Sequence, residues 1–355
     1  MKSIVASAAR SALYGSGALD LWDRFKSVDY VTVVMFHRVL QPDDARWRGA
    51  DPEWTVSSQL FEASLDFMRK HYSVVALDDL LAAQEGSRLP ARPLLITLDD
   101  GWADNADYAA AILTQLGLPA VLFVVADAID RREAFWQERL VAAWQSKRLQ
   151  LSTVRECARS LDIALTGAAA TGESAQALRA IIANLEMLES AFRERLLAAL
   201  SALTEPSETP NQMISTKQLR ALARGGVAIG LHGETHQPLT LVDARAELAA
   251  ARRRIGEALA DPTYPGLATL SFPHGKYNGD VVAAARNSGI RLMFTSDTVL
   301  TPLAADGRLS GDLLGRLHIP THAITDSSGK FAAGRLAGWL RARSTVALKP
   351  EIDFG

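Results

Sequence analysis

The segment Leu94–Gly101 reads LLITLDDG, an apolar run suited to a buried strand, followed by two adjacent carboxylates and a glycine. A second run, Val227–Leu231 (VAIGL), leads directly into His232-Gly-Glu-Thr-His236. Adjacent carboxylates at one strand end and two imidazoles at positions i and i+4 would supply an Asp/His/His metal site with a spare carboxylate beside it. Three protein ligands and an open position are what a hydrolytic metal centre needs to activate water. The two segments therefore predict a catalytic metal site.

Each motif has a simpler interpretation when it is taken alone. Asp-Asp-Gly is common in turns, because Asp accepts local backbone hydrogen bonds and Gly tolerates positive φ. His-x3-His pairs are common on solvated helix faces. The chain holds only seven His, however, and two of them flank this short interval directly after a strand-like run. The combination favours the metal site. Trp102, which follows the Asp pair, is interpreted as a packing residue.

The rest of the chain alternates strand-like and helix-like segments. The other runs that predict buried strands are Val31–Phe36, Ala120–Val125, Ala268–Phe272, Ile290–Thr295 and Leu314–Ile319. Helices are predicted at Gln59–Tyr72, Asp107–Leu116, Ala244–Leu259, Val281–Ser288 and Lys330–Leu340, and from a capping box at Ser215–Gln218 to Gly225. Such alternation implies a parallel sheet, open or closed into a barrel. The chemically distinctive motifs follow strands, where α/β barrels place their active sites.

The predicted organisation is a barrel interrupted by a helical insertion. Residues 30–128 and 213–325 form the two parts of the barrel. In the insertion, residues 129–212, apolar residues from Leu178 to Leu200 have the spacing of one long amphipathic helix. Residues 1–29 are expected to form a helix that packs on the domain, and residues 326–355 a C-terminal helix and tail. We expect the insertion to lie near the catalytic mouth; an oligomer interface or a packing appendage is the alternative.

The composition limits the classes of function. The 355 residues are 48% hydrophobic and 22% charged, as in ordinary globular proteins. Lys and Arg number 38 against 40 Asp and Glu, without a long block of like charge, which argues against a nucleic-acid surface. The single cysteine, Cys157, excludes an intramolecular disulfide and a cysteine-based zinc site. No apolar run reaches the ~18 residues of a membrane span, and the export signal is unconvincing. We expect a cytoplasmic protein, with peripheral membrane contact left open.

Further residues are candidates for the pocket. His37 directly follows the first predicted strand, and His274 lies in a proline- and glycine-containing turn. Arg316 and His318 lie two residues apart on the predicted strand Leu314–Ile319, so they would share one face of it. For this pair, a buried ion pair or an exposed edge is the alternative interpretation.

Five stretches also match known motifs in their order along the chain. They are Met35–Val39 (MFHRV), Leu95–Asn105 (LITLDDGWADN), Met213–Gly226, Ile229–His236 (IGLHGETH) and Ser271–Asn278 (SFPHGKYN). This series resembles the polysaccharide deacetylase family (NodB-homology proteins, carbohydrate esterase family 4). The resemblance implies a distorted (β/α)7 barrel and metal-dependent removal of N-acetyl groups from amino sugars of a glycan. It also implies that Asp99 is the catalytic base and that Asp100, His232 and His236 bind the metal, with zinc as the default.

The chain departs from the family pattern at three motifs. The family's Asp-Trp pair is not visible, although Asp297 lies nearby. The family's Arg-x-Pro-Tyr motif, whose Arg orients the base, reads Ser271-Phe-Pro-His274, so that Arg is missing. The Leu-x-His motif that supplies the general acid reads Arg316-Leu-His318 and retains the His. Arg316 is a candidate to replace the missing Arg by pairing with Asp99. His318 is the preferred acid, because a free histidine has a pKa of about 6.5, which suits proton donation around neutral pH. His274 is the rival donor.

The sequence therefore predicts a metal-dependent hydrolase that removes N-acetyl groups from amino sugars of a bacterial-type surface glycan, lipid-linked forms included. One alternative is a metal-dependent amide hydrolase or deformylase that acts on a small molecule, with the insertion closing the pocket. Another is a non-catalytic glycan-binding homologue, against which the complete ligand set and Asp99 argue. No nucleic-acid partner is predicted, and the oligomeric state is left open.

Overall fold

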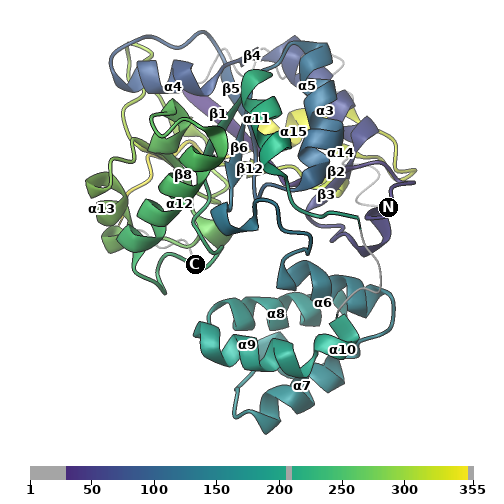
Figure 1. Cartoon of the computed structure of the whole chain (residues 1–355). Coiled ribbons are helices and arrows are strands. Elements are labelled where there is room, and N and C mark those ends of the chain that lie inside the picture. The colour runs from purple at the N-terminus through teal and green to yellow at the C-terminus, as the bar shows by residue number, and fades with distance from the viewer. Residues whose placement is uncertain (1–28, 205–209, 351–355) are drawn as a thin grey trace. The chain divides into compact units, whose positions relative to one another are not determined.

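The computed structural model describes residues 29–204 and 210–350, which form two compact units (Figure 1). The first, here called the barrel unit, contains the described residues up to Gln41, Glu53–Asp130, and those from Ile214 onward. The second, here called the inserted unit, contains Pro42–Pro52 and the described part of residues 131–213. The helix predicted for residues 1–29 lies, apart from Asp29, outside the described residues.

The barrel unit is built on one nearly closed sheet whose main strands are parallel. They are β1 (Tyr30–Phe36), β5 (Pro93–Leu98), β6 (Ala120–Val124), β7 (Val227–Leu231), β8 (Thr269–Ser271), β9 (Leu292–Phe294), β11 (Leu313–Leu314) and β12 (Leu317–His318). Each strand from β1 to β11 in this order pairs with the next, and β12 pairs with β1. Only Gly315 and Arg316 separate β11 from β12, so the chain steps there from one edge of the sheet to the other. The prediction of a distorted (β/α)7 barrel is confirmed.

The single strand predicted at Leu314–Ile319 is wrong, because the chain changes partners inside it. β11 pairs with β9, whereas β12 pairs with β1. Gly315 lies in the short segment between β11 and β12, here called the seam. An added Cβ there would come within 2.4 Å of the Val299 side chain and 2.8 Å of its carbonyl oxygen. Only glycine fits there. Four short strands lie outside the barrel order: β10 (Thr301–Pro302) against β1, β4 (Ser73–Val74) against β5, and β2 (Arg38–Leu40) paired with β3 (Thr55–Ser57).

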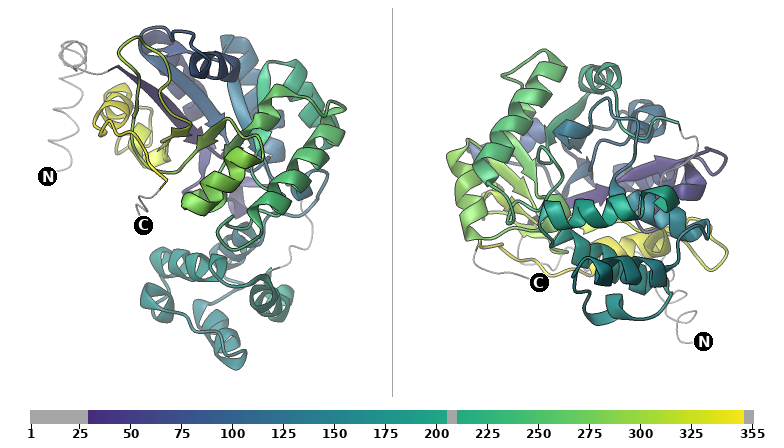
Figure 2. Two further views of the ribbon diagram at one scale, coloured as in Figure 1. Left: turned by 90° about the vertical axis from the view of Figure 1, so that its left-hand side faces the viewer. Right: turned by 60° about the horizontal axis from the view of Figure 1, so that its bottom comes forward.

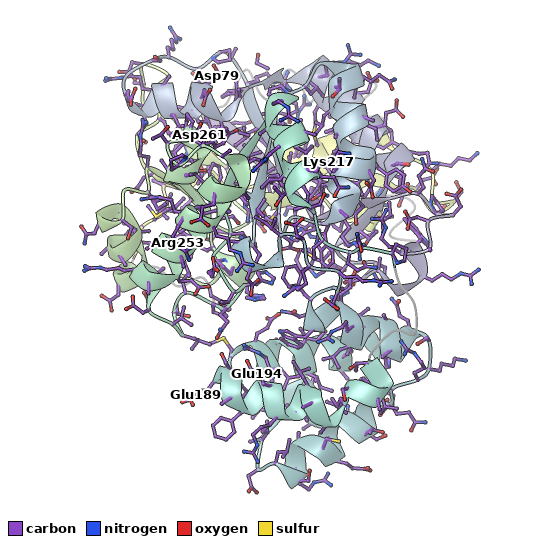
Figure 3. All side chains as sticks on the ribbon, viewed as in Figure 1. Asp79, Glu189, Glu194, Lys217, Arg253 and Asp261 are labelled. Carbon is purple, nitrogen blue, oxygen red and sulfur yellow. The ribbon has the colours of Figure 1, made fainter. Side chains whose placement is uncertain are left out.

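Helices of the barrel unit surround the sheet (Figures 1 and 2). They are α3 (Ser58–His71), α4 (Leu77–Gln84), α5 (Ala110–Leu116), α11 (Thr216–Arg224), α12 (Ala244–Leu259), α13 (Gly279–Asn287), α14 (Thr321–Ile324) and α15 (Ala333–Arg341), with one π turn at Asn105–Ala109 and 3-10 turns at Ala126–Ala128, Pro265–Ala268 and Pro273–Gly275. The predicted capping box is confirmed: Ser215 Oγ accepts from Gln218 N (3.3 Å), and Ser215 N donates to Gln218 Oε1 (3.0 Å). Charged side chains such as Lys217 and Arg253 are exposed on these helices (Figure 3).

Alternate residues of each strand face two different apolar layers. Val33, Leu95, Phe123 and Phe294 belong to one buried cluster, which fills the barrel interior. Their strand neighbours pack against the outer helices in a second cluster: Val34, Ile96, Leu122 and Met293. This is the alternation expected of strands covered on both faces. Interior space is tight, since a Cβ on Gly230 would lie 2.5 Å from the Phe123 ring.

The inserted unit is helical throughout its described residues. Its helices are α6 (Trp136–Gln145), α7 (Leu151–Ser160), α8 (Ala175–Glu186), α9 (Ser190–Ala199) and α10 (Ser201–Thr204), with 3-10 turns at Trp47–Gly49 and Gly167–Ala170. A separate apolar cluster forms its core. Pro42–Pro52, which the sequence analysis did not assign to the insertion, joins it through a bidentate pair of Arg179 with Asp51 (2.8 and 2.5 Å).

The single long helix predicted within the insertion is wrong: α8 and α9 are separate. α8 ends at Glu186, and Glu189, with φ −55° and ψ 140°, starts the next helix. The break changes the phase of the apolar residues. Leu185 and Leu196 are buried as predicted, but Phe192 is 42% exposed.

Both ends of the insertion are held at the carboxyl ends of β5 and β6. Asp130 N donates to Ile214 O (2.9 Å), so the chain leaves and returns at adjacent points. Ile214 N donates to Gly101 O (2.9 Å), and Val125 N to Asp100 O (3.3 Å). The insertion is therefore attached beside the Asp99–Gly101 segment. Within residues 29–204 and 210–350, no helix is long and apolar enough to cross a membrane.

Candidate active site

Both carboxylates of the Asp pair reach the same site because the backbone leaves the strand between them. Asp99 continues the inward-facing series Leu95 and Thr97 of β5 and is 2% exposed. The next residue would point to the opposite face if the strand continued. Asp100 instead has φ 78°, a left-handed conformation that non-glycine residues rarely adopt. Such strain persists where the surroundings over-determine it, commonly at functional sites.

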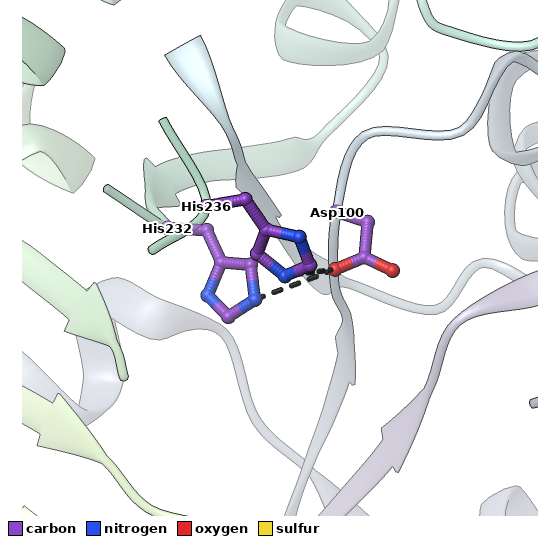
Figure 4. A group of neighbouring side chains, drawn as sticks. All are labelled: Asp100, His232 and His236. Carbon is purple, nitrogen blue, oxygen red and sulfur yellow. Dashed lines mark ion pairs between the residues drawn. The ribbon is translucent and has the colours of Figure 1, made fainter. Parts of the chain in front are cut away.

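Asp100, His232 and His236 form a cluster that could hold a metal ion (Figure 4). The Nε2 atoms of His232 and His236 each lie 3.4 Å from Asp100 Oδ1. Two ligands bound tetrahedrally to one zinc ion at about 2.0–2.1 Å lie roughly 3.4 Å from each other. The donor set and its spacing therefore fit a zinc ion held by three protein ligands.

Hydrogen bonds orient two of these ligands. His232 Nδ1 lies 2.8 Å from the carbonyl oxygen of Ser271. A carbonyl can only accept, so Nδ1 carries a proton, and Nε2 is the ring nitrogen that faces Asp100 and could bind a metal. The indole Nε1 of Trp102 donates to Asp100 Oδ2 (2.8 Å), which leaves Oδ1 toward the histidines. Arg38 lies 4.2 Å from the centroid of the Trp102 ring and pairs with buried Asp104 (2.9 Å). Trp102 thus has a role beyond packing.

Glu247 of α12 holds the loop that carries the two histidines. Its Oε1 accepts from Glu234 N (3.1 Å), Thr235 N (2.6 Å) and Thr235 Oγ1 (2.7 Å). One carboxylate oxygen thereby satisfies three donors in the segment between His232 and His236. His236 has φ 61°, so its conformation depends on this clamp rather than on a regular element.

Arg316 and Asp99 form a bidentate ion pair inside the barrel. Nη1 lies 2.7 Å from Asp99 Oδ1, and Nη2 lies 2.8 Å from Oδ2. The remaining donors bind Thr295 O (2.9 Å), Thr97 Oγ1 (3.4 Å) and Ser271 Oγ (2.8 Å). Arg316 is 1% exposed. The expected pairing with Asp99 is present, and Ser271, at the position of the missing motif Arg, also donates to Asp99 Oδ2 (3.1 Å).

The charge of Arg316 and the burial of the site have opposite effects on the pKa of Asp99. Burial alone would raise the pKa of Asp99, but the Arg316 guanidinium, with help from His232, holds that pKa below its ordinary value. Asp99 is therefore ionised at neutral pH. Burial lowers the pKa of His37 and, together with the neighbouring His274, lowers that of His236 further. These two imidazoles are neutral at neutral pH, as a metal ligand must be.

His37 and His318 meet at an aromatic group with Trp54. The ring centroid of Trp54 lies 4.5 Å from that of His37 and 4.4 Å from that of His318, and the two imidazole centroids are 6.0 Å apart. The charges of Asp99 and Asp100 act on His37. The backbone oxygen of His318 accepts from Trp339 Nε1 of α15 (2.9 Å).

His274 lies against a proposed metal ligand rather than beside Asp99. Its ring centroid is 4.4 Å from that of His236, and its Nε2 is 2.8 Å from the His236 carbonyl oxygen. Its backbone has φ 56°. Asp297, noted because the family's Asp-Trp pair is missing, accepts from Tyr277 Oη (2.7 Å).

The structure thus brings together, in the barrel unit, the residues that the sequence singled out, and adds others. The partners that the sequence analysis did not assign to the site are Ser271, Trp54, Thr97, Glu247 and the Arg38–Asp104 pair. Of these, Ser271 carried a signal, since it stands where the family motif has an arginine.

Comparison with known proteins supports the family resemblance. The profile of the family described as polysaccharide deacetylase matches residues 174–293. No curated protein sequence gives a significant match. A deacetylase from Streptococcus pyogenes, PplD in complex with acetate, has a similar fold, with TM-score 0.56, 14% identity and coverage of 89% of this chain and 100% of the other.

Two further solved structures have the same fold. For IcaB from Ammonifex degensii, the TM-score is 0.52 at 17% identity, over 88% of this chain and 97% of that one. For a de-N-acetylase from Aggregatibacter actinomycetemcomitans, it is 0.51 at 16% identity, over 85% and 98%. At such identities the likeness shows the fold alone. Taken with the family match over residues 174–293, it confirms the resemblance seen in the sequence: the chain is similar to polysaccharide deacetylases of the NodB type, which are hydrolases, and has their fold.

Proposed function

We propose that this protein is a metal-dependent de-N-acetylase that acts on amino sugars of a bacterial-type surface glycan, with zinc at Asp100, His232 and His236. The observation that carries the proposal is the ionised Asp99, paired with Arg316, next to a donor set whose spacing fits zinc. Taken alone, the Asp99–Arg316 ion pair or the Asp/His/His cluster could serve only to stabilise the fold. Together they supply a base and a cation site side by side, which amide hydrolysis requires.

The protein residues divide the chemical work. A divalent cation bound at this site would lower the pKa of water and polarise the acetyl carbonyl. Asp99 accepts the proton of the attacking water. Its two oxygens receive three hydrogen bonds from Arg316 and Ser271, and because a carboxylate offers about four lone-pair sites, capacity for that proton remains.

The leaving amine needs a proton donor, and His318 is the proposed general acid. It lies in the aromatic group with His37, whose imidazole senses the charges of the Asp pair. His274 is less suited, because its Nε2 is engaged by the His236 carbonyl oxygen. We assign it to the support of the metal site.

The proposed substrate is an acetylated glycan, lipid-linked or free. Support comes from the solved structures of similar fold, among them a deacetylase in complex with acetate and a de-N-acetylase. The proposed location is the cytoplasm, with peripheral contact at a membrane when the glycan is lipid-linked. Fractionation of cells that express the protein, with and without a high-salt wash, would test this location.

Acetate release tests the activity. Zinc-loaded protein should release acetate from an N-acetylglucosamine oligomer, and a chelator should abolish the release. Asp99→Asn should retain the metal but lose turnover by roughly 10²–10⁴-fold, the usual contribution of general-base catalysis. Asp100→Asn should lose the metal. The reverse pattern of metal retention would exchange the roles of the two carboxylates.

The same assay separates the alternatives. Formate release from small formamides without acetate release would indicate a deformylase. Oligomer binding with neither metal nor release would indicate a non-catalytic glycan-binding protein. Either result would reject the proposed function.

A further inference from the structure

We infer that Trp54 is a sugar-binding platform of this site, on which a pyranose ring of the substrate packs while its acetamido group reaches the Asp99–Asp100 pair. The inference rests on the proposed function, whose substrate it specifies. Its structural basis is one exposed aromatic ring held against His37 and His318.

The exposure of Trp54 is unusual for this chain. Among the described residues, four large apolar side chains are exposed: Trp54 (38%), Met187, Phe192 and Leu241. Trp54 is the one of these that contacts residues of the proposed site. Exposed apolar surface next to convergent polar groups is typical of ligand sites.

The backbone holds Trp54 in place. It directly precedes β3, which pairs in parallel with β2, and β2 directly follows His37. Arg38 N donates to Trp54 O (3.0 Å), which extends this ladder to the aromatic residue. On the other side, β12 places His318 opposite Met35 of β1. Strand register, rather than a flexible loop, therefore fixes the three rings.

The ring distances place both imidazoles on the same side of the indole. If the imidazoles lay on opposite faces of Trp54, their centroids would be roughly 9 Å apart; they are 6.0 Å apart. Both therefore lie to one side of the indole, and 38% of Trp54 is exposed. The flat, apolar face of an aromatic ring suits the apolar C–H face of a pyranose.

A polar partner lies on the same patch. The Nδ1 of His37 is buried, and no described residue hydrogen-bonds it. Buried polar atoms of this kind usually have a partner. A hydroxyl or acetamido group of a sugar seated on Trp54 would supply one, so the patch offers both contacts that a sugar needs.

The test compares a sugar substrate with one that has no ring. Acetate release is measured from an N-acetylglucosamine oligomer and from triacetin, an aliphatic acetyl ester. Trp54→Ala should raise KM for the oligomer about tenfold, in line with the loss of an aromatic stacking contact, and leave kcat/KM for triacetin within about twofold. Trp54→Phe, which keeps a flat ring, should restore most of the oligomer KM. Leu241→Ala, at an exposed apolar residue outside the ring group, is the matched control and should change neither.

Two outcomes would overturn the inference. One is an unchanged oligomer KM in Trp54→Ala. The other is a parallel loss on both substrates, which would mean that the ring supports the hydrolytic centre instead of the sugar.

Calorimetric binding of the oligomer separates this inference from the proposed function. It is measured in the Asp99→Asn background, with and without Trp54→Ala. Weaker binding in the Trp54→Ala variant, with no acetate release by the wild type, would reject the function and keep the platform. Acetate release by the wild type, with equal binding in both variants, would reject the platform and keep the function. No binding in the Asp99→Asn background would also reject the platform.

Discussion

Arg316 reaches Asp99 from the seam of the barrel, not from the β8 position where the family motif has its arginine. The side chain at that position, Ser271, is small and hydrogen-bonds the guanidinium instead. What the chemistry requires is a cation fixed against the base, and the closed barrel offers more than one strand end from which to supply it. A bidentate arginine also limits basicity, because it stabilises the ionised carboxylate.

The first prediction concerns this pair. Arg316→Met should lower turnover, by less than the roughly 10²–10⁴-fold expected when the base itself is lost. The pKa of Asp99 is now held down by the guanidinium against the effect of burial. Removing the cation should raise it, so the acid limb of the pH–rate profile should move to higher pH. Arg316→Lys should restore part of the activity, because it keeps the charge but not the bidentate geometry.

The measurement is the pH–rate profile at constant metal content. If the acid limb of Arg316→Met coincided with that of the wild type, Arg316 would have a structural role only. Loss of the bound metal in Arg316→Met would assign it to the ligand cluster instead of to the base.

The second prediction concerns the proton donor. The descending limb of the profile should vanish in His318→Gln and survive in His274→Gln. His274→Gln should instead weaken metal binding, because His274 packs on His236 and bonds its carbonyl oxygen. If both variants kept the full bell-shaped profile, neither histidine would be the acid.

The residues proposed to bind the metal and to act as the base could be predicted from the sequence. The residues that hold them in place could not. Asp99, Asp100, His232 and His236 stand in short motifs directly after strands, so their shared location followed from strand order. Glu247 and Trp54 carry no such signal. Glu247 is one acidic residue on a charged helix, and Trp54 becomes part of the site only through the β2–β3 register. Such partners depend on contacts that local patterns do not encode.

At the scale of elements, α12 links the scaffold to the site. Its carboxylate Glu247 accepts three hydrogen bonds from the loop between His232 and His236. The loop has no regular structure of its own, and both Gly233 and His236 adopt positive φ. The helix therefore determines how well the two imidazoles converge.

The third prediction follows from this contact. Glu247→Ala should weaken zinc affinity by about 10–100-fold, the usual effect of losing a residue that orients metal ligands. At saturating zinc, much of the turnover should return. Competition with a chromogenic chelator measures the affinity, and Glu257→Ala, an exposed residue of the same helix, is the control. Unchanged affinity in Glu247→Ala would mean that the histidines are held by other contacts.

Element boundaries were predictable where a local signal marks them. The capping box begins α11, and Gly117, with φ 65°, ends α5. The break between α8 and α9 has no glycine or proline, so the apolar spacing continued across it and indicated one helix. The split between β11 and β12 was hidden for another reason: only two residues separate the strands, and only closure of the sheet gives them different partners.

At the scale of the whole molecule, the chain consists of a barrel interrupted by a helical unit with its own core. The proposed metal ligands, Asp99, Arg316 and His318 all belong to the barrel unit, although residues 131–213 separate Asp100 from His232 in the sequence. The insertion is attached at Asp130 and Ile214, next to the Asp100 loop. The expectation that the insertion lies near the catalytic mouth, with an oligomer interface or a packing appendage as the alternative, stays a prediction.

The fourth prediction uses the separate cores. Calorimetry should resolve two unfolding transitions, because each unit has its own buried apolar cluster. Zinc should raise the midpoint of the barrel transition alone, since a ligand stabilises only the fold that binds it, by about 2.7 kcal/mol at a hundred times Kd. Arg179→Met, which breaks the pair with Asp51, should lower the midpoint of the inserted unit alone.

A single transition that zinc and Arg179→Met both shift would mean that the two cores unfold as one cooperative unit. The insertion would then be required for the stability of the barrel, so a variant that lacks it could not be used to test its contact with substrate.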